Sequence, residues 1–389
     1  MPDNLTRRAG AARIARVAIL AVVAALTVAA RADAQSASFV LRLGRDTIAV
    51  EQYTRTANRL TGEVASRGGA AVTRLQYDVA LGNDGRATSV TYRPRNAAGA
   101  PLPNQPTEVR ITFVGDSARR EAVFADSVST RTVAAARGTP FQSPAFGLLE
   151  IAFAQLRRGN APSLQFGAVN AAGNAAQLTL TAAGGDTVRA STGFVYQVDR
   201  EGRLLSVDGT ATTQKFLSTR GTAPIDVAAV AGRMTPIGTL SPRGAAHGSF
   251  MQSVVFISYG RPQVRERTVW GGVLVPFDAI WRTGANEATH LATSRELAFG
   301  DLVVPPGLYT LYIYNAQSGP QLAINRQVGQ WGTVYDQAQD LGRVPLTMSN
   351  TPEHVEEFTI TIRSLGGGGR GAIDFAWGPQ MATATFTAR

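Results

Sequence analysis

The chain contains no cysteine and only three histidines in its 389 residues. Without cysteine it can form no disulfides, so the folded part must be stabilised by its hydrophobic cores alone. Hydrophobic residues make up 44% of the chain and charged residues 17%, a balance that suits folded domains and excludes a disordered chain. The length is typical of two domains.

Lysine is almost absent as well, because Lys215 is the only one. The formal net charge is +10, and the other basic residues are all arginines. Many arginines alternate with uncharged residues, as in Thr54-Arg55-Thr56, which is the pattern of solvent-facing strand positions rather than of a nucleic-acid surface. We therefore expect no nucleic-acid partner.

The first 34 residues have the organisation of an export signal. Several arginines precede the uncharged apolar run 17–30, and Ala32-Asp33-Ala34 supplies the small-x-small pattern of a signal-peptidase site. The run of about 14 residues is short for a membrane anchor, which needs about 20. We expect a Sec-type signal peptide cleaved after Ala34, no transmembrane anchor after cleavage, and a periplasmic or secreted mature chain.

Residues 35–220 show short period-two alternations that are broken by turn residues. For example, the alternating segment 75–79 leads to Gly82-Asn83-Asp84-Gly85, a pattern typical of an antiparallel meander. The segments 77–90 and 196–207 resemble each other in their order of strand, turn and strand. This similarity predicts two related hairpins on one sheet.

One helix is expected near residues 143–158 of this N-terminal antiparallel β domain. Ser143 can cap it, Pro144 fits its first position, and Phe146, Leu149 and Phe153 lie at roughly helical spacing. The helix either caps an ordinary core or fills the concavity of a curved sheet, as in periplasmic carriers of lipoproteins or lipids.

The stretch 221–240 is interpreted as a linker, because prolines, glycines and threonines are scattered through it. Residues 241–389 then show short strand patterns without a convincing helix, which predicts a C-terminal β-sandwich or jelly-roll-like domain. The strands are expected at 253–259, 296–299, 308–315, 321–325, 344–348, 357–363, 372–377 and 382–387. The fold class is therefore mainly β.

No motif in the sequence specifies a reaction. Gly115-Asp116-Ser117 resembles the nucleophile block of one class of esterases, but no aspartate stands three residues before a histidine, and no Gly-x-Ser-x-Gly elbow occurs. Glu287 and His290 have a spacing used by helical metal sites, yet their surroundings favour a strand, in which positions three apart face opposite sides. We expect no cofactor and keep a metal site at Glu287 and His290 as an alternative.

A polar and aromatic stretch with little strand pattern contains the candidate binding residues Tyr259, Arg261, Arg267, Trp281, Arg282, Asn286 and Glu287. They form either a structural clasp or a pocket. In the clasp, Arg282 and Glu287 make a buried ion pair, Trp281 belongs to the core and Asn286 forms a turn. In the pocket, Trp281 is a stacking platform and the polar groups bind a ligand. Residue types favour the clasp.

Several blocks resemble, in order and spacing, a bacterial exported family known as domain of unknown function 2911. They are Tyr259-Gly260-Arg261-Pro262, Leu274-Val275-Pro276-Phe277, W-R-T-G-A-N-E-A-T at 281–289 and Pro306-Gly307-Leu308-Tyr309-Thr310-Leu311. The resemblance covers about residues 241–389 and implies an exported β-rich domain without an established activity. The family pattern ends at Thr289, so it does not include His290.

We therefore expect an exported two-domain β-protein that binds a ligand or partner in the cell envelope without catalysis. The ligand could be a glycan, a peptide or a lipid. One alternative is an envelope-acting hydrolase or metal-dependent enzyme that uses Glu287 and His290. Another is an outer-membrane β-barrel or a lipid carrier.

Overall fold

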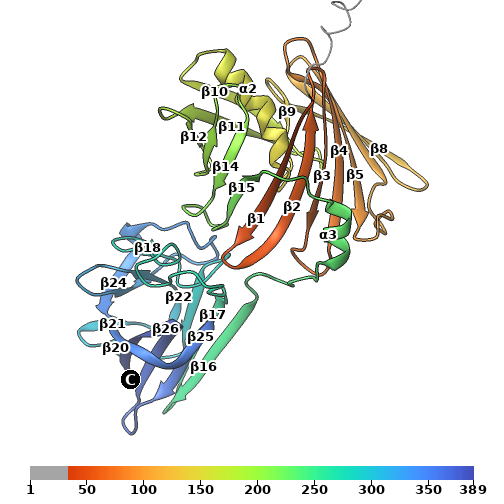
Figure 1. Cartoon of the computed structure of the whole chain (residues 1–389). Helices are drawn as coiled ribbons and strands as arrows, with labels where there is room; N and C mark the ends of the chain where they lie inside the picture. The colour runs from red at the N-terminus through yellow and green to blue at the C-terminus, as the bar shows by residue number, and fades with distance from the viewer. Residues whose placement is uncertain (1–33) are drawn as a thin grey trace, which may run out of the picture.

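A computed structural model describes residues 34–389. The expected signal peptide lies outside these residues apart from Ala34, and the first strand begins at Gln35. Two β-rich domains follow one another along the chain (Figure 1). Within the described range, no helix is both long and apolar enough to cross a membrane.

The N-terminal domain is built on one 15-stranded sheet whose strands follow a meander, with β15 returning to pair with β1. All its pairs are antiparallel except β9 with β10. The strands are β1 (Gln35–Leu43), β2 (Asp46–Arg55), β3 (Arg59–Ser66), β4 (Thr73–Leu81), β5 (Ala87–Asn96), β6 (Glu108–Val114), β7 (Ser117–Val123), β8 (Val128–Ala134), β9 (Thr139–Pro140), β10 (Ser163–Val169), β11 (Ala175–Ala182), β12 (Thr187–Ala190), β13 (Val195–Val198), β14 (Leu204–Asp208) and β15 (Leu217–Gly221).

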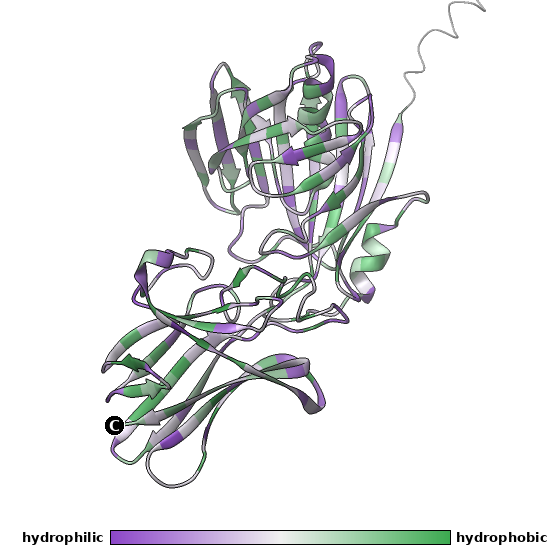
Figure 2. Ribbon diagram, turned by 90° about the vertical axis from the view of Figure 1, so that its left-hand side faces the viewer, coloured by the Kyte–Doolittle hydropathy of each residue, from purple (hydrophilic) through white to green (hydrophobic). Residues whose placement is uncertain are grey.

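Period-two alternation explains why these segments form strands. In β4, Tyr77 and Val79 are buried, and they pair with the buried Tyr92 and Val90 of β5. Hydrophobic and hydrophilic residues alternate along many strands of both domains (Figure 2). The two similar hairpins expected from the sequence are β4–β5 and β13–β14, and both belong to this one sheet.

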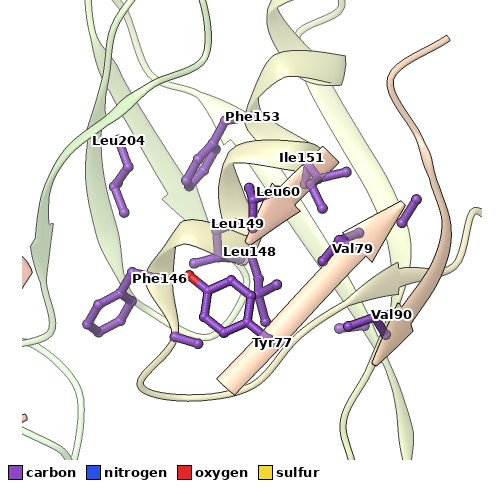
Figure 3. Close-up of a cluster of buried hydrophobic side chains, with 14 of the residues drawn as sticks. Leu60, Tyr77, Val79, Val90, Phe146, Leu148, Leu149, Ile151, Phe153 and Leu204 are labelled. Carbon is purple, nitrogen blue, oxygen red and sulfur yellow. The ribbon is translucent and has the colours of Figure 1, made fainter. Parts of the chain in front are cut away.

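The expected helix is present and packs inside the sheet. It consists of a 3-10 turn, η1 (Phe146–Leu149), and α2 (Glu150–Arg158). Both lie between the two halves of the sheet (Figure 1). Their apolar side chains, among them the fully buried Leu148 and Phe153, meet Leu60 and Val79 from one half and Leu204 from the other (Figure 3). The helix therefore fills the core.

The start of this helix differs from the prediction. Ser143 and Pro144, joined by a cis peptide bond, precede the helical turn, whose N-cap Ala145 offers no side-chain hydrogen bond. The carboxyl oxygens of Glu51 on β2 accept hydrogen bonds from the backbone N–H groups of residues 146 and 147. A strand residue distant in sequence thus satisfies the donors that a local Ser cap was expected to satisfy.

The stretch 221–240 connects the two sheets, but it is not simply a loop. It contains α3 (Val227–Arg233), which Asp226 caps by accepting a hydrogen bond from the Ala229 N–H. Val227 and Ala231 of α3 pack against Val50 and other apolar residues on the outer face of the first sheet. Most of the expected linker therefore belongs to the N-terminal domain.

The C-terminal domain has two antiparallel sheets around one core, as expected for a sandwich. The first sheet has the order β16-β17-β19-β22-β23-β24, with β18 beside β22, and the second has the order β21-β20-β26-β25. The strands are β16 (Arg243–Phe250), β17 (Ser253–Gly260), β18 (Ile280–Trp281), β19 (Thr289–Thr293), β20 (Leu297–Phe299), β21 (Leu302–Val304), β22 (Gly307–Tyr314), β23 (Gln321–Asn325), β24 (Asp340–Pro345), β25 (Thr347–Ser364) and β26 (Arg370–Ala388), and a 3-10 turn, η2 (Gln337–Gln339), precedes β24.

Three details of the predicted strands are wrong. The expected strand 344–348 covers the end of β24 and the start of β25. The expected strands 372–377 and 382–387 are parts of the single 19-residue strand β26, and 357–363 is the second half of β25. Irregular pairing between β25 and β26 near Val355 interrupts the alternation without ending either strand. The segment 261–279, expected to have little strand pattern, runs without a strand from β17 to β18.

Candidate ligand site between the domains

The turn between β1 and β2 joins the N-terminal domain to segment 261–279 of the C-terminal domain. The Arg45 N–H donates to the Arg265 carbonyl at 3.1 Å. Gly44, with φ +60°, lies so close that a Cβ there would be 2.0 Å from this carbonyl oxygen. Only glycine fits this approach.

Charged side chains surround this backbone contact. Arg265 forms an ion pair with Asp46, which also lies 3.4 Å from the Arg67 guanidinium. Arg45 reaches Glu266 at 3.4 Å. Arg265 is only 5% exposed, so its pairing with Asp46 offsets part of the cost of burying that charge at the domain boundary.

Beside this junction lies a cavity of about 690 Å³, which we call the interdomain cavity. Its N-terminal wall comes from β1, β2 and the β14–β15 loop (residues 209–216), and its C-terminal wall comes from segments 262–286 and 331–335 with β22 and β26. Aromatic side chains from both domains line it: Phe216, Trp281, Tyr312, Trp331, Tyr335 and Trp377. A volume of this size suits a small organic ligand.

The W-R-T-G-A-N block forms a tight turn in the cavity wall. Thr283, Gly284 and Asn286 all have positive φ, and the buried Thr289 hydroxyl donates to the Thr283 carbonyl at 2.7 Å. This rigid turn positions Trp281, which is 8% exposed and stacks on Trp377 with ring centroids 5.5 Å apart. Trp281 is therefore both a core residue and part of the cavity lining.

Arg282, Asn286 and Arg267 also line the cavity. The Arg282 guanidinium donates to the Asn286 carbonyl at 3.2 Å and lies over the Trp331 ring, 5.9 Å from its centroid. Arg267 donates to the carbonyls of Val264 and Gln263. Burial, together with repulsion by Arg265, lowers the pKa of Arg267 to about 10, so it stays protonated at neutral pH.

Lys215, in the β14–β15 loop, brings a cation to the same cavity from the N-terminal domain. Burial lowers its pKa, and repulsion by Arg282 and Arg267 lowers it further. Among the described residues, Lys215 has no hydrogen-bond or ion-pair partner, whereas Arg265 is paired with Asp46. The cavity lining given by residues 34–389 includes no Asp, Glu or His.

Three of the seven predicted binding residues lie away from the cavity, namely Tyr259, Arg261 and Glu287. Tyr259 is 3% exposed and its hydroxyl accepts a hydrogen bond from the Ile360 N–H, so it belongs to the sandwich core. The Arg261 guanidinium forms an ion pair with Glu357 at 2.5 Å. Neither side chain reaches the cavity lining.

The buried ion pair predicted between Arg282 and Glu287 is wrong. The Glu287 side chain is 58% exposed, and its carboxylate lies 3.7 Å from Arg243. The residues between Arg282 and Glu287 form the tight turn, which leaves Arg282 at the cavity and carries Glu287 to the surface. Trp281 is buried in the core and Asn286 lies in a turn, as in the clasp interpretation. The ion pair of that interpretation is not formed, because Glu287 pairs with Arg243.

Glu287 and His290 also do not share a binding arrangement. The Nε2 atom of His290 accepts a hydrogen bond from the Gly329 N–H at 3.0 Å, while Glu287 faces Arg243. Burial and the nearby Arg243 lower the pKa of His290, which favours the neutral ring. Across residues 34–389, no three His, Asp or Glu side chains gather in a way that could hold a metal ion.

The family comparison matches the C-terminal domain, which contributes the W-R-T-G-A-N turn to the cavity wall. Residues 241–386 match the family described as "Protein of unknown function (DUF2911)". The resemblance expected from the sequence is confirmed for this part of the chain, and the N-terminal domain matches no family. Comparisons with the curated proteins and with the solved structures find no similar chain. The DUF2911 region thus contributes Arg267, Trp281, Arg282 and Asn286 to the cavity, opposite a domain outside the match.

Sequence reasoning missed Lys215, Arg265 and Trp331. Arg265 and Trp331 are ordinary residues of loops, and their roles depend on contacts with distant segments. Lys215 carried one signal, because it is the only lysine in an arginine-rich chain. Being the only lysine does not indicate which residues of the C-terminal domain face Lys215.

Proposed function

We propose that this protein binds a small organic ligand in the interdomain cavity, within the cell envelope and without catalysing a reaction. The observation that carries the proposal is the cavity itself, which both domains build and whose aromatic lining is interrupted by a few polar groups. The export pattern of the first 34 residues supports the location.

Binding rather than catalysis is supported by the chemistry of the lining. Its polar side chains are guanidinium, ammonium, hydroxyl and amide groups, and the lining within residues 34–389 holds none of the His, Asp or Glu side chains that most often transfer protons in enzymes. The alternative hydrolase, based on Glu287 and His290, draws no support from this arrangement, because neither residue lines the cavity. A lipid remains one of the ligand classes to test.

A cavity-filling substitution tests the proposal. Gly68 lines the cavity, its φ is not in the left-handed region, and a Cβ there meets no atom within 4 Å. Gly68→Phe should therefore fill part of the cavity without disturbing the fold. Gly367, in the β25–β26 hairpin loop, has the same open surroundings away from the cavity, so Gly367→Phe is the matched control.

The mature chain and both variants would be screened by thermal shift against envelope glycans, peptides and lipids. Mass spectrometry of solvent extracts would identify small molecules that copurify. We expect at least one compound that raises the melting temperature of the wild type and of Gly367→Phe, and raises that of Gly68→Phe much less. If every stabilising compound acts equally on all three proteins, or none stabilises the wild type, the proposed function is wrong.

A further inference from the structure

The charges of the interdomain cavity identify the class of its ligand, and this inference rests on the proposed function. Four cationic side chains line the cavity, namely Lys215, Arg265, Arg267 and Arg282. Only Arg265 has a carboxylate within ion-pair distance among the described residues. The other three line the same cavity, and Arg282 and Arg267 lie close enough to Lys215 to lower its pKa.

Such a group of charges is unfavourable in a partly desolvated cavity. Burial lowers the pKa of each of the three groups, and for Lys215 repulsion by Arg282 and Arg267 adds to this cost. Carboxylates beyond ion-pair distance, Glu287 for Arg282 and Glu356 and Asp46 for Arg267, offset the cost only in part. Arg267 and Arg282 use part of their N–H donors on backbone carbonyls, and these neutral partners orient the guanidinium groups without neutralising them. An oxyanion would offset the repulsion and accept the remaining donors.

The rest of the cavity lining is largely apolar, with a few hydroxyl and amide side chains such as Thr212 and Gln214 among the apolar ones. On the N-terminal side, Leu41, Leu43, Ile48 and Phe216 line it. On the opposite side, Leu274 and the Trp281–Trp377 stack line it. A ligand that fills this space must therefore combine an acidic group with an apolar body.

We propose that the ligand is an organic anion with an apolar body, whose acidic group binds between Lys215, Arg267 and Arg282. Within the described cavity lining, Lys215 is the only cation from the N-terminal domain and has no ion-pair partner, so an anion bound there links the two domains. Neutral glycans, which would stack on the exposed face of Trp331 without using these charges, are the competing class.

Two fluorescent probes that differ in one charged group test this inference. 8-Anilinonaphthalene-1-sulfonate carries a sulfonate on an apolar aromatic body, and N-phenyl-1-naphthylamine is the same body without it. Each would be titrated into the full mature chain, into Lys215→Gln and Lys215→Arg, and into Arg200→Gln. Arg200 is an exposed arginine in the β13–β14 turn, outside the cavity lining.

We expect one binding site for the sulfonate, with an affinity at least about tenfold higher than that of the neutral probe. A single charge-assisted contact is worth roughly this factor. Lys215→Gln should weaken sulfonate binding about tenfold and leave the neutral probe unchanged, whereas Lys215→Arg and Arg200→Gln should keep the wild-type affinities. Dodecanoate should displace the sulfonate probe, and inorganic phosphate at the same concentration should not.

Equal affinities for both probes, or a Lys215→Gln variant that binds the sulfonate like the wild type, would overturn the charge assignment and leave cavity binding intact. Displacement by inorganic phosphate as effective as by dodecanoate would overturn the apolar half of the proposal. If neither probe binds, the anion inference is wrong, and the Gly68→Phe comparison still decides whether the cavity binds any ligand.

Discussion

The guanidinium of Arg265 in the C-terminal domain pairs with the carboxylate of Asp46 in the N-terminal domain. Arg265 is almost fully buried, and Asp46 is also shared with Arg67. This pair lies at the edge of the interdomain cavity, where Arg265 is one of the lining residues. The geometry of the ligand site therefore depends on an electrostatic contact between residues far apart in the sequence.

Asp46→Asn should lower the free energy of unfolding by about 3 kcal/mol, because it leaves a buried guanidinium without its counter-charge. Urea unfolding of the mature chain measures the change. Asp301→Asn is the control, because Asp301 is exposed and forms no ion pair among the described residues. A loss no larger than that of the control would show that the Arg265 charge is compensated in another way.

Gly44→Ala should weaken the docking of the two domains. The new Cβ would be placed 2.0 Å from the Arg265 carbonyl oxygen, and φ at this position is +60°. Gly115→Ala is the control that separates backbone strain from the collision with Arg265. Gly115 has a similar φ of +55°, but an added Cβ there would meet no atom within 4 Å.

Unfolding of these variants can be followed with two probes. All four tryptophans lie in the C-terminal domain, so their fluorescence reports on that domain, whereas far-UV circular dichroism reports on both. For Gly44→Ala we expect the two transitions to separate, and for Gly115→Ala we expect them to coincide as in the wild type. Coincident transitions in Gly44→Ala would mean that the β1–β2 turn does not couple the domains.

Unfolding should also depend on pH through Glu51. Burial raises the pKa of this carboxyl from 4.5 to about 8. The folded state therefore binds the proton more tightly than the unfolded chain. The stabilising contribution of Glu51 is complete below about pH 4.5 and is lost as the pH rises towards about 8.

Across this interval the free energy of unfolding should fall by up to about 1.4 kcal/mol per pH unit relative to Glu51→Gln. The Gln amide oxygen can still accept from the Phe146 and Gly147 N–H groups, and its NH₂ can donate to Tyr77. Denaturant unfolding between pH 5 and 9 would measure the difference between the two proteins. Parallel pH profiles would show that Glu51 does not titrate in this range.

Trp281→Ala and Glu287→Ala should have very different effects on stability. The Trp281 ring is buried against Trp377 and Phe358, so its truncation should cost about 3–5 kcal/mol. Glu287 makes only an exposed ion pair with Arg243, so its truncation should change the free energy of unfolding by less than about 0.5 kcal/mol. A large destabilisation by Glu287→Ala would instead support a buried ion pair between Glu287 and Arg282.

Much of the fold could be predicted from the sequence because strands and hairpins are specified by neighbouring residues. The alternation around Tyr77 and Tyr196 predicted two hairpins, and both are present in one sheet. The end of the helix at Arg158 agrees with the prediction. Its start could not be predicted, since Glu51 and not Ser143 satisfies its first N–H groups. The continuous strand β26 was also missed, because irregular pairing hides its alternation.

The candidate site was predictable only in its C-terminal half. The W-R-T-G-A-N block pointed to Trp281, Arg282 and Asn286, which line the cavity. Residue types could not decide where Glu287 points, because the direction of its side chain depends on the positive φ values at Thr283 and Asn286 and on the position of Arg243.

The sequence by itself determined two β-rich domains, the helix in the first domain and the family resemblance of the second. These features follow from hydrogen bonding and burial within short segments. Only the tertiary structure decided that Lys215 lies opposite Arg267 and Arg282 and that Asp46 neutralises Arg265. Burial and charge pairing at the domain boundary depend on contacts between segments that are far apart in the sequence. Local periodicity carries no information about such contacts.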